Sequence, residues 1–138
     1  MLTVTPDVLT TIIAHAREQA PIEACGYLAE KDGVTSKVFR LTNADASAEH
    51  FSLLPAEQFA AVRAMRLDGY RLRAVYHSHP ASPARMSEED IRLAIDPSLS
   101  YVIVSLASPQ PVVKAFTILR KVEEESIAVA GAAIGKEH

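Results

Sequence analysis

The spacing of apolar residues predicts two amphipathic helices in the first half of the chain. Apolar side chains recur at helical spacing after Pro6 and the pattern stops before Pro21, so this segment is expected to form a helix with one buried face. Thr5 is the expected N-cap of that helix. A second helix is expected from Pro55 to about Leu67. Its inner face carries four apolar residues: Phe59, Ala61, Val62 and Met65.

Runs rich in β-branched and aromatic residues predict strands between and after these helices. Residues 23–30 and 34–41 flank a Lys-Asp-Gly turn and are expected to form a hairpin. Residues 42–50 have the composition of a loop, and a short helix (SEEDIRLAI) is expected to begin at Ser87 and to stop at Asp96. The other expected strands are a short one at 51–54, then 71–79, a central one at 101–106, and two more at 112–119 and 122–130.

This order of elements predicts one α+β domain with α/β/α layers, in which helices cover a mixed β-sheet. The sequence contains no repeat, linker or low-complexity segment, so a single domain is expected over residues 1–138. The end of the chain, GAAIGKEH (131–138), is expected to be disordered.

Composition narrows the class of protein. The 138 residues are 49% hydrophobic and 22% charged, which is typical of a globular domain. The net charge of −3 does not favour a nucleic acid or an anionic membrane as partner. Cys25 is the single cysteine, so an internal disulfide is excluded and a reducing compartment is expected. No signal peptide is apparent and no apolar run approaches the roughly 20 residues that span a bilayer, so we expect a cytoplasmic protein.

The segment that carries candidate chemistry is His77-Ser78-His79, at the end of the strand expected at 71–79. Side chains two positions apart on a strand point to the same face, so both histidines can present a ring nitrogen to one point. Asp90 lies on the next short helix and can supply a carboxylate. Two histidines and one carboxylate leave a fourth tetrahedral position for water, which is a ligand set of catalytic Zn²⁺ sites.

Simpler interpretations of the same residues stay open. Two histidines on a strand with one solvent face can be ordinary exposed polar residues. Ser87 and Asp90 also match a capping box, in which the serine caps the helix and the acidic residue reaches back. The capping box is compatible with a metal site, because Ser87 can cap the helix and still offer its hydroxyl to the site. The joint occurrence of these residues around a proline-containing loop favours the metal site.

A site that activates water also needs a base, and Glu23 is the candidate. It begins an otherwise apolar strand, where an unpaired buried carboxylate is costly. The alternative is that Glu23 lies at a solvent-exposed strand end, and the sequence leaves both interpretations open. Cys25 is expected to be buried and unreactive. His15 and His50 are expected to be packing or surface residues, although His50 could line a substrate cleft.

Taken together, these residues resemble the JAMM motif of the MPN (JAB1/MPN/Mov34) metalloproteases: Glu23, then His77-x-His79-Pro80, then Ser87-x-x-Asp90. The resemblance covers nearly the whole chain and includes EACGYL at 23–28 and YVIVSL at 101–106. It implies the family fold, a mixed and curved β-sheet flanked by helices, of the cytidine-deaminase-like type.

The resemblance also implies a role for each residue of the motif. His77, His79 and Asp90 bind Zn²⁺. Glu23 takes a proton from the metal-activated water and later passes it to the leaving amine. Ser87 donates a hydrogen bond that helps to stabilise the oxyanion of the tetrahedral intermediate.

The loop at 80–86 is short and leaves no room for the long insertions of the eukaryotic deubiquitinases in this family. The chain therefore resembles the compact bacterial peptidases that cut after the C-terminal Gly-Gly of ubiquitin-like sulfur-carrier proteins. This resemblance implies a peptidase or isopeptidase that acts on such a carrier protein in sulfur transfer. The sequence allows a homodimer but does not determine the oligomeric state. The stretch 42–54 is a candidate for binding the substrate tail by strand addition at a sheet edge.

Three other functions compete with this interpretation. A non-catalytic MPN scaffold would have lost metal ligands, and all of them are present here. A zinc deaminase would need a Pro-Cys-x-x-Cys pair, which a single cysteine excludes. A pure binding module would recognise a carrier protein without cutting it, and its binding would survive Glu23→Ala.

Overall fold

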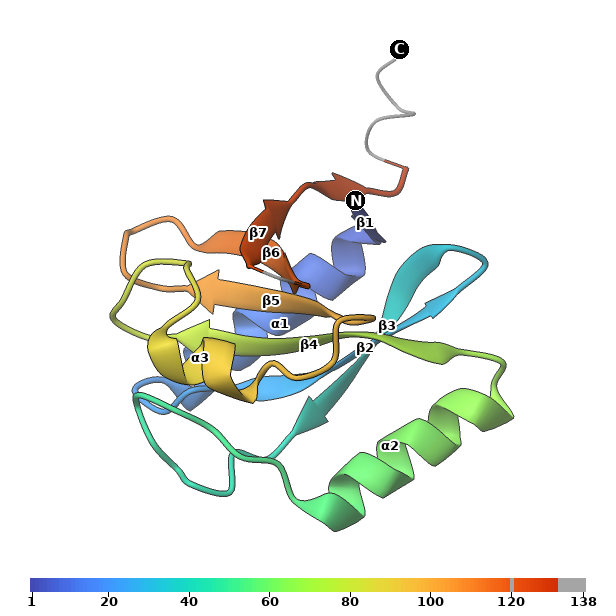
Figure 1. The fold of residues 1–138 in the computed structure, drawn as a ribbon, viewed down its shortest axis with the longest axis horizontal. Coiled ribbons are helices and arrows are strands. Elements are labelled where there is room, and N and C mark those ends of the chain that lie inside the picture. Colours follow the sequence, from blue (N-terminus) through green and yellow to red (C-terminus); the bar gives the residue numbers. More distant parts are fainter. Residues whose placement is uncertain (120, 132–138) are drawn as a thin grey trace.

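The computed structural model describes residues 1–119 and 121–131. Helices and strands in these ranges are labelled in Figure 1. The helices are α1 (Pro6–Gln19), α2 (Pro55–Leu67) and α3 (Glu88–Leu93). The strands are β1 (Leu2–Val4), β2 (Cys25–Lys31), β3 (Val34–Leu41), β4 (Arg71–His79), β5 (Ser100–Ser105), β6 (Val112–Ile118), β7 (Val122–Glu125) and β8 (Ile127–Val129).

These strands form one mixed sheet with the order β7-β6-β5-β4-β2-β3-β1-β8. β2 pairs antiparallel with β3 and with β4, so the predicted hairpin is confirmed. Asp32 and Gly33 at its turn have φ values of 54° and 81°, the left-handed conformation that tight hairpin turns need. β5 runs parallel to β4, whereas β6 and β7 follow as antiparallel strands. The predicted α+β class with a mixed sheet is therefore confirmed.

The sheet is curved, and its two edge strands are consecutive in the chain. β7 pairs with β6 at one edge, while β8 pairs in parallel with β1 at the other edge. Ser126 alone separates β7 from β8, and its carbonyl accepts a hydrogen bond from the Leu2 N–H at 2.9 Å. The single strand predicted at 122–130 is therefore wrong, because the chain changes partner strand at Ser126. Sequence analysis missed β1, because so short a segment carries little periodicity.

Helices cover both faces of the sheet (Figure 1). α1 packs on one face, against a core that includes Leu28, Tyr76 and Val102. α2 lies on the opposite face, over a core that includes Tyr27 and Met65. Successive side chains of a strand point to opposite faces, so each inner strand contributes to both cores. α3 and the loop before it lie on the same face as α2, where the candidate site is found.

Both long helices begin and end as predicted, but some of their contacts differ from the prediction. Thr5 occupies the N-cap position of α1, yet its hydroxyl makes no capping hydrogen bond. On α2, Ala61 and Met65 are buried and Val62 is partly buried, whereas Phe59 is 71% exposed. The prediction for Phe59 is wrong because a residue two positions from Ala61 lies on nearly the opposite side of a helix.

Three further sequence predictions can be compared with the structure. Residues 51–54 form no strand, because Ser52 bonds within its own loop, where its carbonyl accepts the Ala44 N–H at 2.9 Å. α3 ends at Leu93, before the predicted end of that helix. The disorder expected at 131–138 falls outside the described residues except at its first position. Within residues 1–119 and 121–131, no helix is long and apolar enough to cross a membrane.

Candidate metal centre

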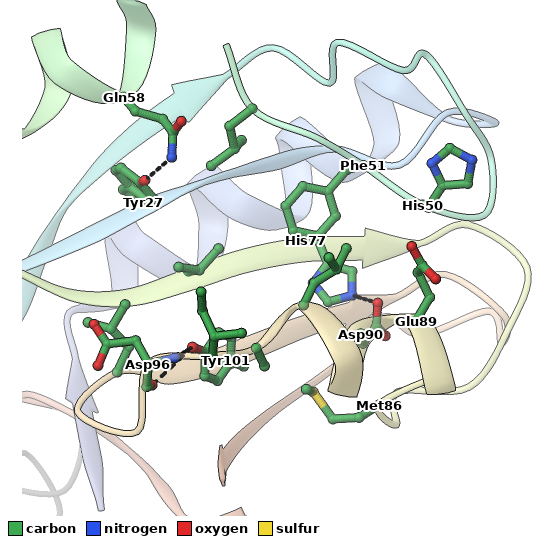
Figure 2. Close-up of a pocket in the computed structure, with 16 residues that line it drawn as sticks. Tyr27, His50, Phe51, Gln58, His77, Met86, Glu89, Asp90, Asp96 and Tyr101 are labelled. Carbon is green, nitrogen blue, oxygen red and sulfur yellow. Dashed lines mark hydrogen bonds and ion pairs between the residues drawn. The ribbon is translucent and has the colours of Figure 1, made fainter. Parts of the chain in front are cut away.

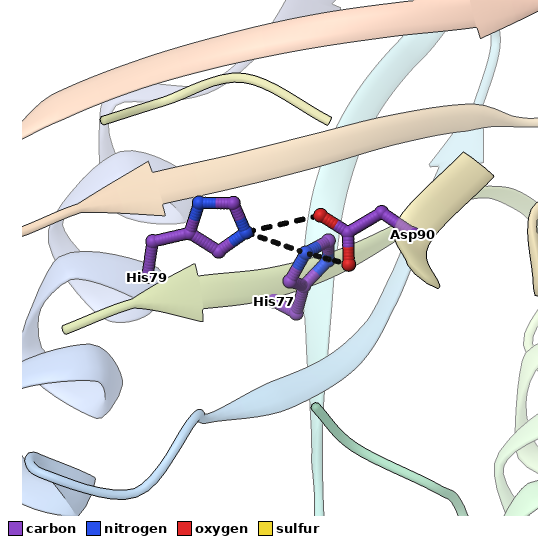
Figure 3. Close-up of side chains that lie close together, drawn as sticks. All are labelled: His77, His79 and Asp90. Atoms are coloured by element: carbon purple, nitrogen blue, oxygen red, sulfur yellow. Dashed lines mark hydrogen bonds and ion pairs between the residues drawn. The ribbon is translucent and has the colours of Figure 1, made fainter. Parts of the chain in front are cut away.

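The end of β4 presents two imidazoles on one face of the sheet. His77 and His79 are both buried, and their Nε2 atoms lie 3.2 Å apart. α3 brings the Asp90 carboxylate to the same point (Figure 3). Asp90 Oδ1 lies 3.1 Å from His77 Nε2, and Oδ2 lies 3.0 Å from His79 Nε2. The three residues expected from the sequence as ligands therefore form one buried group.

A capping box at the start of α3 fixes the Asp90 carboxylate. Ser87 Oγ accepts a hydrogen bond from the Asp90 N–H at 3.0 Å, and the Ser87 N–H donates to Asp90 Oδ2 at 2.9 Å. The capping interpretation of Ser87 is therefore confirmed. Burial acts to raise the pKa of Asp90, but hydrogen bonds from His77 and His79 outweigh it and hold that pKa well below its usual range. Asp90 is thus an anion, as a carboxylate ligand must be.

The outer nitrogen of His79 is held as well. His79 Nδ1 lies 2.8 Å from the carbonyl oxygen of Pro83. A carbonyl can only accept, so Nδ1 carries a hydrogen, and Nε2 is the ring nitrogen that faces Asp90 and that a metal ion would bind after losing its proton. Metal-binding histidines usually donate their other ring N–H to a carbonyl or carboxylate in this way.

The spacing of the three donors fits Zn²⁺. Two atoms bound at about 2.0–2.1 Å in tetrahedral geometry lie about 3.3 Å from one another. The two Nε2 atoms lie 3.2 Å apart, and each lies 3.0 or 3.1 Å from one of the two carboxylate oxygens of Asp90. Imidazole nitrogen and carboxylate oxygen are also ligand types that Zn²⁺ accepts, and three protein ligands leave a fourth position open.

Glu23 lies buried near this group. It precedes β2, which begins at Cys25 and not at residue 23 as predicted. Glu23 is 2% exposed, and its Oε1 atom has no hydrogen-bond partner among the described residues. Burial raises the pKa of the Glu23 carboxyl to about 8, while the nearby positive charge of His79 acts in the opposite direction. The alternative in which Glu23 is exposed to solvent is therefore wrong.

The candidate ligands His77, His79 and Asp90 are called the metal group below. A groove of about 270 Å³ reaches this group across the face that α2 and α3 cover (Figure 2). His77 and Asp90 form part of its lining. Phe51 forms part of the wall, and its ring stacks on that of His77 with centroids 4.9 Å apart. Farther along, Gln58 donates a hydrogen bond to the Tyr27 hydroxyl at 2.8 Å. The groove is therefore largely apolar, with polar groups at a few points.

Sequence analysis missed most residues of this groove. Tyr27, Gln58 and Tyr101 come from β2, α2 and β5, which meet only in the folded chain. The Tyr101 hydroxyl donates to the Asp96 carbonyl and accepts the Asp96 N–H, each at 3.0 Å. An aromatic residue on a strand is an ordinary core signal, so no local pattern distinguishes these positions. His50 does line the groove, as the sequence had allowed.

Cys25 and His15 lie outside the metal group. Cys25 is fully buried, and burial raises the pKa of its thiol, which agrees with the expected unreactive cysteine. His15 belongs to α1, on the other face of the sheet. Its Nδ1 lies 2.7 Å from the hydroxyl oxygen of Tyr76, and both residues are buried. His15 is therefore a packing residue.

Comparison with known proteins adds a family match and named relatives. A family model described as prokaryotic homologs of the JAB domain matches residues 5–119. The chain is 36% identical over 111 residues to CysO-cysteine peptidase of Mycobacterium tuberculosis, which covers 79% of this chain and 76% of that protein. It is 37% identical over 82 residues to the probable TtuB-protein conjugate cleaving protease of Thermus thermophilus, covering 59% of this chain and 55% of that protein.

Solved structures share the fold. Protein DSY2949 from Desulfitobacterium hafniense is 47% identical, with a TM-score of 0.84 over 94% of this chain and 92% of that chain. A JAB1/MPN domain protein from Archaeoglobus fulgidus is 22% identical, with a TM-score of 0.67 over 94% of this chain and 97% of that chain. The predicted MPN fold is therefore confirmed.

Proposed function

The chain belongs to the prokaryotic JAB family, and from this premise we propose its reaction. It is a zinc-dependent peptidase that hydrolyses the bond after the C-terminal Gly-Gly of a ubiquitin-like sulfur-carrier protein. The observation that carries the proposal is the buried group of His77, His79 and Asp90 beside a groove. The names of two relatives, CysO-cysteine peptidase and TtuB-protein conjugate cleaving protease, support a carrier-protein conjugate as substrate.

His77, His79 and Asp90 are the residues that would hold the zinc ion, through two ring nitrogens and a carboxylate oxygen. Zn²⁺ would act there as a Lewis acid that polarises the scissile carbonyl and lowers the pKa of water. Two of these ligands are held by hydrogen bonds to the backbone: Ser87 N–H holds Asp90, and the Pro83 carbonyl holds His79.

Glu23 is the proposed general base. Its buried carboxyl has an oxygen without a hydrogen-bond partner among the described residues, so that oxygen is available to a water molecule. Glu23 would accept a proton from the attacking water and later donate it to the leaving amine. The raised pKa places this carboxyl near neutrality, where one group can both accept and release a proton, and a bound cation would lower that pKa again.

Ser87 is the proposed donor to the oxyanion. Its Oγ accepts the Asp90 N–H, so its hydroxyl hydrogen can be donated to another group. A hydrogen bond to the carbonyl oxygen strengthens as negative charge develops on that oxygen in the transition state. Ser87 thus combines a structural role at the start of α3 with a chemical one.

The groove is the proposed binding site for the C-terminal tail of the carrier. Glycine residues lack side chains, so a Gly-Gly tail can pass Phe51 and approach His77 and Asp90. The stretch 42–54 folds as a loop and offers no sheet edge for strand addition. The proposed contacts for the tail are therefore the three residues of this loop that line the groove, His50, Phe51 and Leu53. A competition assay with an internal peptide tests this specificity: equal cleavage of both substrates would contradict it.

The deciding experiment measures zinc content and cleavage together. The substrate is a ubiquitin-like carrier protein extended beyond Gly-Gly, and mass spectrometry follows the released residue. We expect about one zinc per chain and cleavage by the wild type. Glu23→Gln should keep zinc and lose cleavage, whereas His77→Ala should lose both. Glu123→Gln, which changes an exposed carboxylate on β7 in the same way, serves as the matched control and should stay active.

Each outcome separates the candidate functions. Zinc without cleavage would keep the metal site and contradict the proposed substrate. Carrier binding that survives Glu23→Ala, with no product from the wild type, would indicate a binding module. A protein that holds no zinc and remains inactive after zinc is added back would be a scaffold.

A further inference from the structure

The side-chain amide of Asn43 is a hub of hydrogen bonds in the loop between β3 and α2. Its Nδ2 lies within hydrogen-bonding distance of three carbonyl oxygens and its Oδ1 within that of two N–H groups. The acceptors are Glu23 O at 3.1 Å, Ser47 O at 3.3 Å and His50 O at 3.0 Å, and the donors are Asp45 N at 3.0 Å and Ser52 N at 3.4 Å. Carbonyl oxygens surround one end of the amide and N–H groups surround the other. This pattern assigns Nδ2 to the first end and Oδ1 to the second.

The Asn43 amide holds both the backbone carbonyl and the backbone N–H of Glu23, the first directly and the second through Ser47. Glu23 lies before the first paired residue of β2, so the sheet ladder does not hold it. Its carbonyl accepts from Asn43 Nδ2, and its N–H donates to Ser47 O at 2.9 Å. Ser47 O is also an acceptor for Asn43. The backbone of the proposed base is therefore held by the loop, and Asn43 holds the loop.

The same amide connects Glu23 to the part of the loop that carries Phe51, which lines the groove. Asn43 Oδ1 accepts the Ser52 N–H, and the Ala44 N–H donates to Ser52 O at 2.9 Å. The preceding residue, Phe51, stacks on His77 with ring planes 29° apart. One side chain therefore fixes the base on one side and the aromatic contact to a metal ligand on the other.

We infer that Asn43 is a positioning residue that holds the Glu23 carboxylate in place for catalysis. The Glu23 carboxyl has one oxygen without a partner among the described residues, so its direction depends strongly on its backbone. Displacement of a catalytic group by about 1 Å can lower a rate by about 100-fold. Asparagine suits this position because it donates and accepts at once, whereas alanine does neither and aspartate cannot donate. The inference rests on the proposed role of Glu23 as the base.

The test compares Asn43→Ala and Asn43→Asp with Ser52→Ala as the matched control. Ser52→Ala removes the hydrogen bond from Ser52 Oγ to Asp45 Oδ1 at 2.8 Å, but it keeps the backbone hydrogen bonds of Ser52 to Asn43 Oδ1 and from the Ala44 N–H. The control thus removes one hydrogen bond from the same loop but keeps both backbone hydrogen bonds of Glu23. Both Asn43 variants should lower kcat at least about ten-fold, while Ser52→Ala stays within about two-fold. All three variants are assayed at saturating zinc, so that a change in zinc affinity through Phe51 does not contribute to kcat.

A second measurement does not depend on activity. Hydrogen exchange of the Glu23 amide, followed by NMR, reports whether its backbone is held, and it should become at least about ten-fold faster in Asn43→Ala and stay unchanged in Ser52→Ala. Unchanged exchange, or an equal loss of kcat in Ser52→Ala, would overturn the inference. A change confined to KM would overturn it too, because it would show that Asn43 only shapes the groove. If the wild type has no peptidase activity but the Glu23 amide still exchanges faster in Asn43→Ala, the proposed function is refuted. The structural link between Asn43 and Glu23 then remains.

Discussion

The ring of Phe51 stacks on the imidazole of His77, with centroids 4.9 Å apart and an angle of 29° between the planes. Phe51 lies where the sequence predicted a short strand, but the structure has a loop there, and its ring covers one of the candidate metal ligands. Stacking restricts the orientation of the imidazole and shields it from water on one side. The loop between β3 and α2 is therefore part of the candidate metal centre.

Replacing Phe51 by alanine should weaken zinc binding. Aromatic stacking contributes about 0.5–1.5 kcal/mol beyond the burial of area. Loss of that contribution corresponds to an affinity about 2–10-fold lower. Competition with a chromophoric chelator measures the change. Leu53→Ala is the control, because Leu53 lines the same groove, and an equal loss in both variants would show that stacking is not the cause.

Two substitutions at Ser87 separate its structural role from its proposed chemical role. Ser87→Ala removes the helix cap and should lower the free energy of unfolding by about 1 kcal/mol. It should also lower kcat by about 100-fold, because one donor to the oxyanion is lost. Ser87→Asn can still cap α3 through its side-chain oxygen but lacks the hydroxyl. We expect it to recover stability in urea unfolding and to remain slow; recovery of both would leave capping as the sole role.

The stability of the metal-free protein should depend on the ionisation of Glu23. Burial raises the Glu23 pKa from 4.5 to about 8, so the folded state binds more protons than the unfolded state between these values. The stabilising contribution of the protonated carboxyl is complete below pH 4.5 and is lost as pH rises through about 8. Wild type should therefore lose stability relative to Glu23→Gln as pH rises, by at most about 1.4 kcal/mol per pH unit.

Urea unfolding in a chelator, at several values between about pH 5 and about pH 8.5, measures this difference. Other titrating groups occur in both proteins, so their effects largely cancel when the two curves are subtracted. A difference that stays constant with pH would show that Glu23 has an ordinary pKa in the folded protein. That result would argue against its burial beside the metal group.

Gly26 should not tolerate a larger side chain. A Cβ atom at this position would lie 2.4 Å from the Phe39 carbonyl oxygen and 2.4 Å from Cε2 of Tyr76, which is fully buried. Gly26→Ala should therefore destabilise the fold by about 3 kcal/mol, measured by urea unfolding. Gly33→Asn is the control, because no atom lies within 4 Å of that position and asparagine tolerates its φ of 81°. Equal midpoints for the two variants would contradict the packing argument.

Local patterns were sufficient for most secondary structure. Both helices begin at a proline in the first turn. α1 ends before Pro21 and α2 before Asp68-Gly69, as predicted. The hairpin could be predicted from Asp32 and Gly33, because tight hairpin turns need positive φ and few residue types adopt it. The division of the last strand at Ser126 could not be predicted, because it depends on which distant strands offer free edges on either side.

By itself, the sequence determined which residues are chemically capable of forming the metal group. The spacing of His77 and His79 on a strand, and the capping box that holds Asp90, are local features and can be inferred from local rules. The tertiary structure alone decided what surrounds them. Burial of Glu23, the contact of Phe51 with His77 and the groove itself need segments that are far apart in the chain. Such contacts form because folding buries apolar area shared by several elements, and no local pattern records which elements will share it.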